Sequence, residues 1–242
     1  MIGIIIVTSV VLIIIIAIMK SRHNALLNES YWTEKNKDLH TDLNKLLYES
    51  TKKLNDNNID YFLIGGTLLG SVRGKKIIPW DDDIDIAIYH KPGQKNILID
   101  KIKRIFNCDE TMVIDFCDLS KQVKDVGFGL KIIDTKTGNF LDIFMFTNIS
   151  KNKISFSHPM FRLAHPTMWI TNDELVNENR CILGDTSYDC PSNTSNVIKR
   201  WFGNDALETG RITHVHDSNI IDRFIIRFFS FFKMNKVKSR IK

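Results

Sequence analysis

The pattern of hydrophobic and polar positions opens with an uncharged apolar run from Ile2 to Met19. At about 1.5 Å per helical residue this run is roughly 27 Å long, close to the thickness of a bilayer's hydrocarbon core. The residues that follow, KSRHN, lack the small-x-small site at which a signal peptide is cleaved. We therefore expect an uncleaved, single-pass transmembrane helix here.

The middle of the chain alternates between helical and strand periodicity. A lead-in amphipathic helix is predicted over Glu34–Leu54, where leucines recur at helical spacing among polar residues. The next expected elements are a strand over Tyr61–Ile64, a short helix through TLLGSVR capped by Thr67, and a strand over Ile84–Tyr89. A helix that begins at Pro92 is expected to turn Ile97, Leu98, Ile102 and Ile105 inward. A strand over Thr111–Phe116 and a hairpin with arms Val126–Ile133 and Phe140–Phe146 are expected to follow. This order predicts an α+β fold, a small mixed sheet with flanking helices.

A second amphipathic segment, NIIDRFIIRFFSFFK, runs from Asn219 to Lys233 near the end of the sequence. Isoleucines and phenylalanines occupy one broad helical face, and the following segment KMNKVKSRIK is basic and without acids. Such a helix is typical of a membrane-surface element, and equally of a helix docked on its own domain. Both interpretations stay open at this point.

Composition refines the picture only a little. The 242 residues are 43% hydrophobic, which suits one globular domain with attachments. Lys20 and Arg22 follow the apolar run, and by the positive-inside rule they favour a cytosolic domain, while sequons and cysteines leave a lumenal one open. The cysteines lack close C-x-x-C spacing, so we expect buried thiols, with disulfides as the alternative in an oxidising compartment: Cys108, Cys117, Cys181 and Cys190.

The chemistry-bearing stretch is IPWDDDIDIAIY, which ends in the strand over Ile84–Tyr89. Because side chains alternate along a strand, Asp81, Asp83 and Asp85 are expected on one side and the isoleucines in the core. Acids about 6.6 Å apart along a strand can converge on a divalent cation through oxygen ligands. The spacing does not match an EF-hand loop. We expect a Mg²⁺ or Mn²⁺ site formed by these three aspartates.

Two further groups belong with this acidic strand. Upstream, Gly65, Gly66 and Thr67 stand at a strand-to-helix junction, where backbone N–H groups can approach phosphate, and Arg73 closes the short helix. Downstream, Asp142 lies in the apolar strand FLDIFMF, where an isolated acid is usually paired or bound to metal. Lys131 in the preceding hairpin arm can face the same site.

These residues resemble a known family pattern. The stretch GGTLLG with Arg73, followed by IPWDDDID, is similar to the LicD family, which includes fukutin and the fukutin-related protein. Looser similarity runs through Asp142 to YDCPSNTSNVIKRWFGND, although Trp201-Phe202-Gly203 stands where the family has Tyr-Gly. The resemblance covers roughly residues 35 to 210.

The resemblance implies a nucleotidyltransferase-like fold and a metal-dependent transferase. It implies transfer of a phosphorylated small group, such as phosphocholine or an alditol phosphate, from a CDP-linked donor to a glycan hydroxyl. Family roles fall on Asp83 and Asp85 as metal ligands, Asp81 beside them, Asp142 as the third acid, and Gly65, Gly66 and Thr67 around the phosphates. The expected partners are that donor, a glycan or glycoconjugate acceptor and a membrane, with no nucleic acid.

The alternatives are an Asp-x-Asp glycosyltransferase, a nucleotidyltransferase that keeps the nucleotide on its product, and an inactive membrane-bound scaffold. The last would be expected to have lost an acid, and this chain keeps them all. The expected division is residues 1–22 as transmembrane anchor, 23–58 as helical lead-in, 59–212 as catalytic domain and 213–242 as basic amphipathic helix and tail.

Overall fold

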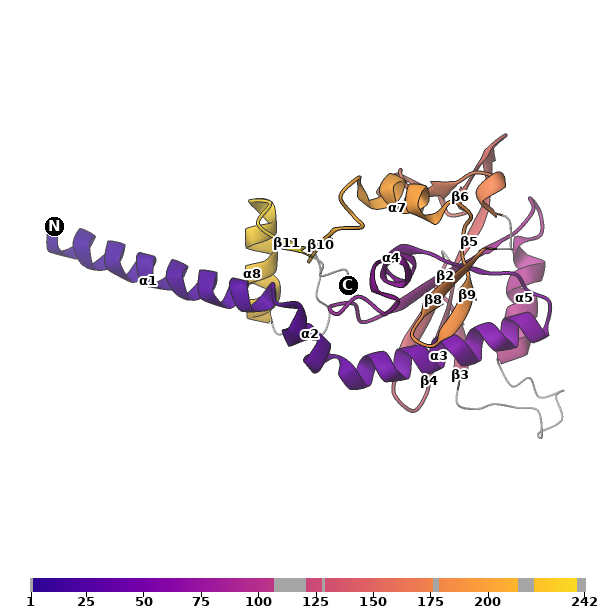
Figure 1. Ribbon diagram of the computed structural model, residues 1–242, viewed down its shortest axis with the longest axis horizontal. Coiled ribbons are helices and arrows are strands. Elements are labelled where there is room, and N and C mark those ends of the chain that lie inside the picture. Colours follow the sequence, from indigo (N-terminus) through magenta and orange to yellow (C-terminus); the bar gives the residue numbers. More distant parts are fainter. Residues whose placement is uncertain (1, 107–120, 128, 176–178, 213–219, 239–242) are drawn as a thin grey trace.

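A computed structural model describes residues 2–106, 121–127, 129–175, 179–212 and 220–238. Figure 1 shows the long helix α1 (Ile2–Leu26) projecting from the region that holds the sheet. Its stretch Ile6–Leu26 is long and apolar enough to cross a membrane and is hardly buried. These properties fit the expected anchor in length and composition, which are criteria that a signal sequence also meets.

A seven-stranded mixed sheet forms the centre of the fold. Along its main path lie β1 (Phe62–Leu63), β2 (Ile84–Tyr89), β5 (Phe140–Ser150), β4 (Gly129–Asp134) and β3 (Lys121–Asp125). The long strand β5 also pairs with β6 (Lys153–Phe156), which pairs with β7 (Trp169–Ile170). Strands β2 and β5 run parallel, and the other described pairs are antiparallel. The predicted α+β fold with a small mixed sheet is confirmed.

Alternation along β2 separates the core from the acidic side. Ile84, Ile86 and Ile88 are at most 1% exposed. Helix α3 (Lys37–Asp56) packs its buried leucines toward the sheet and contacts β5, as its helical spacing predicted. Helix α5 (Lys95–Phe106) contacts both α3 and β3, and α4 (Gly65–Gly74) lies against β2. The isoleucines of β2 therefore face the core, and its acidic side is directed away from the core, where a functional site can form.

The lead-in helix is shorter at its start than predicted, because a separate helix α2 (Glu29–Lys35) precedes it. The buried Asn36 separates the two helices, and its side-chain amide donates a hydrogen bond to the carbonyl oxygen of Pro79 at 2.9 Å. That bond ties the start of α3 to the loop that carries the aspartates.

Short elements form the last third of the chain. They are α6 (Pro159–Ala164), a 3₁₀ turn (Asp173–Leu175), β8 (Arg180–Leu183), β9 (Thr186–Asp189), α7 (Thr194–Phe202), β10 (Thr209–Arg211), α8 (Ile220–Phe231) and β11 (Lys236–Lys238). Strands β8 and β9 form one hairpin, and β10 pairs with β11 across the segment that contains α8. A pair of hydrogen bonds, both 2.8 Å, joins the Arg200 guanidinium of α7 to the buried Glu174.

Two predictions about the helix after β2 are wrong. It begins at Lys95 and not at Pro92, because Gly93 adopts a left-handed backbone (φ +83°) that makes a turn. Ile97 lies on the outer face and is 68% exposed, while Ile99, Ile102 and Phe106 point inward. The predicted strand Thr111–Phe116 lies outside the described residues, and β3 was not predicted.

The cysteine prediction is wrong for one pair. Cys181 and Cys190 form a disulfide, with Cα atoms 5.9 Å apart. The pairing of β8 with β9 sets Cys181 opposite Tyr188, and this brings Cys190, just beyond the strand, within reach. Both residues are nonetheless buried. Cys108 and Cys117 lie outside the described residues.

Candidate active site

The parallel pairing of β2 with β5 sets two acids side by side. Asp85 of β2 is in register with Asp142 of β5, and neighbouring strands lie about 4.8 Å apart. Asp83 immediately precedes β2, and one carboxylate oxygen from each of these three residues lies within 4.8 Å of the other two. The three aspartates, which come from two separate parts of the sequence, thus form one cluster in the structure.

Lys131 faces this cluster from the opposite side of β5. It is the cross-strand partner of Asp142 in the β4–β5 pair. Its ammonium donates to Oδ2 of Asp142 at 3.1 Å and lies 2.9 Å from Oδ1. Burial raises the pKa of the Asp142 carboxyl, and Lys131 opposes that shift. The expectation that Lys131 faces the site is confirmed.

The two glycines that begin α4 lie directly against the protein's own carboxylates. A Cβ atom on Gly65 would lie 2.7 Å from Oδ2 of Asp85, and one on Gly66 would overlap Oδ2 of Asp81. Gly65 also has a left-handed backbone (φ +58°), which residues with a Cβ rarely adopt. Glycine is therefore required at both positions so that α4 and the acidic loop can approach each other.

Thr67 has a different place from the predicted one. Helix α4 begins at Gly65 after the extended residue Ile64, so Thr67 lies inside the first turn and does not cap the helix. Its hydroxyl accepts a hydrogen bond of 2.8 Å from the backbone N–H of Asp85. The first-turn N–H groups of α4 have no acceptor within the helix itself. Thr67 thus fixes the start of β2 against the helix terminus.

Electrostatics in the cluster are strongly unfavourable to so many negative charges. Burial first, and then the neighbouring Asp83 and Asp82, raise the pKa of Asp81 to about 8, which Arg73 partly opposes. Burial, Asp83 and Asp142 raise the pKa of Asp85 well above its usual range. Carboxylates held together in this way keep a proton unless a cation compensates their charge.

The donor set of the cluster fits a hard divalent cation. Oδ1 of Asp142 is buried and lies 2.9 Å from the Lys131 ammonium, whose single positive charge is less than the negative charge of the three carboxylates. Three carboxylates supply oxygen ligands, which Mg²⁺ and Mn²⁺ prefer. Asp81, which the sequence predicted as a third ligand beside Asp83 and Asp85, is not in this group, because its carboxylate lies against Gly66.

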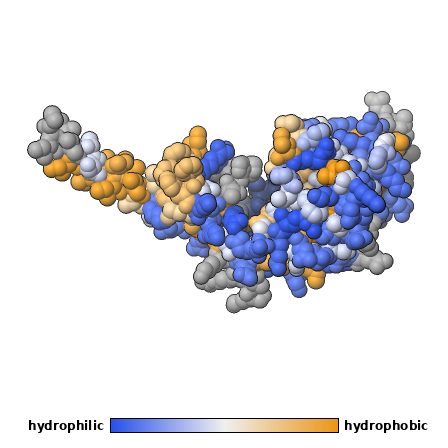
Figure 2. Space-filling model, turned by 90° about the horizontal axis from the view of Figure 1, so that it is seen from above, coloured by the Kyte–Doolittle hydropathy of each residue, from blue (hydrophilic) through white to orange (hydrophobic). Residues whose placement is uncertain are grey.

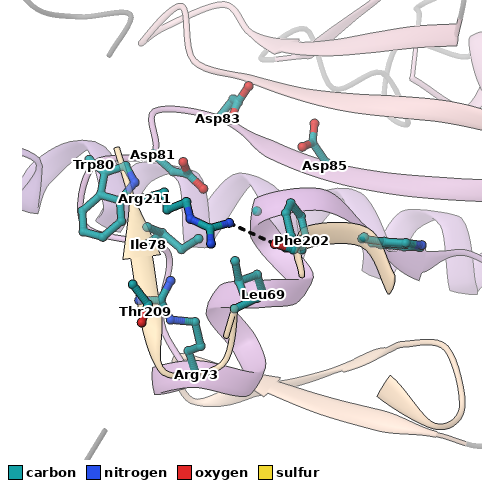
Figure 3. Close-up of a pocket in the computed structure, with 13 residues that line it drawn as sticks. Leu69, Arg73, Ile78, Trp80, Asp81, Asp83, Asp85, Phe202, Thr209 and Arg211 are labelled. Carbon is teal, nitrogen blue, oxygen red and sulfur yellow. Dashed lines mark hydrogen bonds between the residues drawn. The ribbon is translucent and has the colours of Figure 1, made fainter. Parts of the chain in front are cut away.

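A cavity of about 450 Å³ opens beside the acids (Figure 3). Asp81, Asp83 and Asp85 border it on one side, and aromatic residues Trp80, Trp201 and Phe202 supply flat apolar surface. The remaining lining residues are Gly66, Leu69, Arg73, Ile78, Ala206, Thr209 and Arg211. The cavity combines an acidic cluster, aromatic faces and two guanidinium groups.

The two arginines reach the cavity in different ways. Arg73 extends from the last turn of α4, its buried Nε has no hydrogen-bond partner among the described residues, and burial lowers its pKa. Arg211 of β10 is held by Asp205 through two hydrogen bonds of 2.8 and 2.9 Å, and it bonds the Phe202 carbonyl at 3.3 Å. Figure 3 shows its guanidinium between Asp81 and Phe202.

Strand β10 forms a wall that the sequence did not reveal. A Cβ atom on Gly210 would lie 2.6 Å from Cη2 of Trp80 and 2.9 Å from Nη2 of Arg73, so the strand rests against both side chains. The motif RWFGND was a usable signal for Trp201 and Phe202. Nothing in the sequence pattern pointed to Thr209 or Arg211, which lie in a three-residue strand without periodicity.

The model of the LicD/FKTN/FKRP nucleotidyltransferase domain matches residues 58–193, more than half of the chain, and the chain belongs to this family. That range contains the glycines, the aspartates and Lys131, and it ends before Trp201 and β10. The resemblance inferred from the sequence is confirmed.

Curated relatives extend well beyond this chain. An uncharacterized protein of Rickettsia typhi is 34% identical over 55% of this chain and 36% of its own length, and one of Rickettsia prowazekii is 29% identical over 66% and 53%. The lipopolysaccharide cholinephosphotransferase LicD of Haemophilus influenzae is 28% identical over 43% and 41%. The chain thus spans about a third to a half of the length of these relatives.

Among solved structures, the antibiotic-resistance factor ANT(2″)-Ia superposes in two forms. A crystal structure in complex with adenylyl-2″-tobramycin gives a TM-score of 0.38 at 13% identity, covering 61% of this chain and 68% of that one. A solution structure gives 0.42 at 12%, covering 80% and 85%. The fold assignment rests on the family match and on the sheet itself.

Proposed function

We propose that the protein is a metal-dependent transferase that moves a phosphorylated small group, phosphocholine or an alditol phosphate, from a CDP-linked donor to a hydroxyl of a glycan or glycoconjugate. The observation that carries this proposal is the three-aspartate cluster at the edge of a cavity with two guanidinium groups. The family, which includes a lipopolysaccharide cholinephosphotransferase, supports the same reaction class.

The proposed roles follow from position. Asp83, Asp85 and Asp142 would hold Mg²⁺ or Mn²⁺, which when bound neutralises the diphosphate and polarises the reacting phosphorus. Arg73 and the first-turn amides of α4 approach the cavity from one side and would bind phosphate oxygens. The aromatic faces of Trp201 and Phe202 offer a surface for the cytosine base or the transferred group.

The reaction is a substitution at phosphorus. The acceptor oxygen forms a bond to the phosphorus of the transferred group, the bond to the CMP oxygen breaks, and CMP leaves with the bonding electrons. Asp142 would take the proton of the acceptor hydroxyl, and the Lys131 ammonium beside it would favour its ionised form. Arg211, at the cavity wall, would stabilise the charge that develops on CMP.

Calorimetry on the full chain in detergent tests the proposal with CDP-choline, CDP-ribitol, CDP-glycerol and UDP-sugars, each with and without Mg²⁺. A CDP-linked donor should bind only in the presence of metal, and Asp83→Asn should abolish that binding while Asp100→Asn, an exposed position on α5, leaves it unchanged. Preference for a UDP-sugar would support the glycosyltransferase alternative. Binding without metal would exclude the proposed site.

Product analysis separates the remaining alternatives. Incubation with donor and acceptor should release free CMP and leave the phosphorylated group on the acceptor. A nucleotide found on the acceptor would instead identify a nucleotidyltransferase. Metal-dependent donor binding with no product from any acceptor would favour the inactive scaffold.

For localisation, we place the chain at a membrane through α1, with the catalytic domain on an oxidising, extracytosolic side. The Cys181–Cys190 disulfide supports this side because disulfides persist in oxidising compartments, and it outweighs the two basic residues after the span. Labelling of free thiols in cells, before and after reduction, checks this assignment. Labelling of Cys181 and Cys190 without reduction would place the domain in the cytosol.

A further inference from the structure

Helix α8 (Ile220–Phe231) is apolar on two opposite faces. Its buried face consists of Asp222, Ile225, Ile226 and Phe229. The other face, together with the residue just past the helix, is exposed to between 43% and 82%, and we call it the outer face of α8: Ile220, Ile221, Phe224, Phe228, Phe231 and Phe232. Monomeric soluble proteins rarely leave so large a contiguous apolar patch uncovered.

The buried face of α8 packs on the end of α1. The Arg22 guanidinium donates two hydrogen bonds, of 2.8 and 2.7 Å, to the buried carboxylate of Asp222. The His23 ring stacks on Phe229 with centroids 4.2 Å apart, and the Lys20 ammonium lies 5.3 Å from the same ring centroid. One of the two interpretations of the C-terminal segment, a docked helix, is therefore right for this face, although it docks on α1.

The contacts also fix the direction of α8. Asp222 and Phe229 are seven residues apart, about 10 Å along a helix. Both nevertheless contact residues 20–23, which form a single turn of α1. Figure 1 accordingly shows α8 crossing the end of α1 and not running alongside it. If α1 spans a bilayer, α8 lies along the plane of the bilayer surface.

The depth of α8 follows from the same residues. Lys20 and Arg22 are the first charges after the uncharged run of α1, whose side chains from Ile6 to Ile18 are exposed. A bilayer that covers this run up to Lys20 has its headgroup region at the level of α8. Figure 2 shows the hydrophobic surface of α8 beside that of α1, at the same end of the molecule.

Charge on α8 suits an anionic lipid surface. Arg223 and Arg227 lie on the flank between its two apolar faces, and Lys233 follows the helix. Its one acid, Asp222, is buried and already neutralised by Arg22. Basic side chains beside an aromatic apolar face are the pattern of helices that lie in the lipid–water interface.

Helix α8 is also connected to the cavity at both of its ends. Strand β10, which carries Thr209 and Arg211 of the cavity wall, precedes it in the chain, and β11 follows it. The two strands pair, and the backbone N–H of Ile212 donates to the Asn235 carbonyl at 3.1 Å. The strand that follows α8 thus pairs with the strand that carries Thr209 and Arg211 of the cavity wall.

We propose that α8 is an interfacial membrane helix whose outer face is embedded among lipid acyl chains, so that the domain is attached at two points and its cavity is held at the bilayer surface. The proposal rests on the anchoring by α1 proposed above. The partner it commits to is an anionic lipid bilayer. An acceptor carried on a membrane lipid would then meet the cavity without leaving the surface.

The test uses the full chain reconstituted in vesicles of zwitterionic lipid with about one-third anionic lipid. An environment-sensitive fluorescent amino acid replaces Phe231, Ile13 or Ile97 in three separate variants. Ile97 is the matched control, since it is apolar and 68% exposed, on α5 at the far end of the domain. Each variant is quenched in parallel by nitroxide-labelled lipid and by aqueous iodide.

We expect lipid quenching at positions 231 and 13 to exceed that at position 97 several-fold, and iodide quenching to show the reverse order. Lipid quenching at 13 without lipid quenching at 231 would overturn the proposal while leaving the anchor intact. No lipid quenching at 13 would overturn the anchoring itself. A probe at 231 shielded from both quenchers would show that a protein surface, such as a second copy of the chain, covers the outer face, which also overturns the proposal.

Discussion

The buried carboxyl of Asp81 makes the stability of the metal-free protein depend on pH. Its pKa is 3.8 in the unfolded chain and about 8 in the folded one. A group whose pKa is raised on folding stabilises the fold fully below its unfolded pKa, and this contribution is lost as the pH rises through the folded value. We therefore expect the metal-free protein to become more stable as the pH falls from 8 towards 4.

The size of the effect follows from the two pKa values. At pH 7 roughly three pH units separate the solution from the unfolded pKa, and each unit is worth about 1.4 kcal/mol, so folding pays about 4 kcal/mol to protonate Asp81. At pH 5 the same term falls to about 1.5 kcal/mol. Acidification from pH 7 to pH 5 should stabilise the fold by roughly 2–3 kcal/mol, or about 5–10 °C in Tm for a chain of this size.

The assay is thermal unfolding of the full chain in detergent with EDTA, at pH 5, 6 and 7, for the wild type and for Asp81→Asn. The variant should lose the part of the gain that comes from Asp81 and keep the part that comes from Asp85 and Asp142, whose pKa values are also raised, and it should be more stable than the wild type at pH 7. His40, whose ring nitrogen bonds the Asp81 carbonyl at 2.8 Å, has a pKa lowered by burial. The backbone contact remains in the variant, so the difference between the two proteins isolates the Asp81 carboxyl.

Asp100→Asn removes one charge from the exposed side of α5 and should follow the wild type at every pH. The reasoning is refuted if Asp81→Asn gains as much on acidification as the wild type does. That result would mean that Asp81 is ionised in the metal-free fold and paired with Arg73.

Three further results are expected. Gly66→Ala should destabilise the protein by about 1–3 kcal/mol in thermal unfolding, because the new methyl overlaps a carboxylate, and a loss near zero would mean that the loop can move aside. Lys131→Met should shift the acidic limb of the pH–rate profile upward, since the ammonium 2.9 Å from Asp142 no longer lowers its pKa, and an unmoved limb would remove Asp142 as the base. Reduction of the Cys181–Cys190 bond should lower stability by roughly 2–3 kcal/mol, measured as Tm, whereas an unchanged Tm would show that β8 and β9 hold without it.

The alternation of side chains along strands gave the most accurate predictions from the sequence. Ile84, Ile86 and Ile88 are core residues as expected, and Asp85 faces the other way. The sequence also predicted that Asp142 joins the acids of β2 at one site, because an acid in so apolar a strand needs a compensating partner. The local pattern was therefore enough to predict which side chains are buried in a strand whose two faces differ in polarity.

The remaining features depend on contacts between distant segments. The sequence predicted that Gly66 lets phosphate approach the start of α4, but it did not predict that the carboxylate of Asp81 also lies against this glycine. Thr67 matched a helix cap, but its bond to Asp85 requires β2 to lie against α4. No periodicity in three residues of β10 could place Arg211 at the cavity. Contacts between distant segments determine the roles of these residues, and local propensity carries no information about such contacts.

The wall formed by Trp201, Phe202, Thr209 and Arg211 has an evolutionary consequence. These residues lie after residue 193, where the family match ends, whereas the acids and glycines lie before it. In the proposed function, the residues assigned to chemistry and those assigned to selectivity are therefore encoded in separate stretches of the gene. Under the same proposal, substitutions after residue 193 change which group the cavity admits while the acids stay as they are, so exchange of the C-terminal fifth of the chain would retarget the reaction in a single recombination.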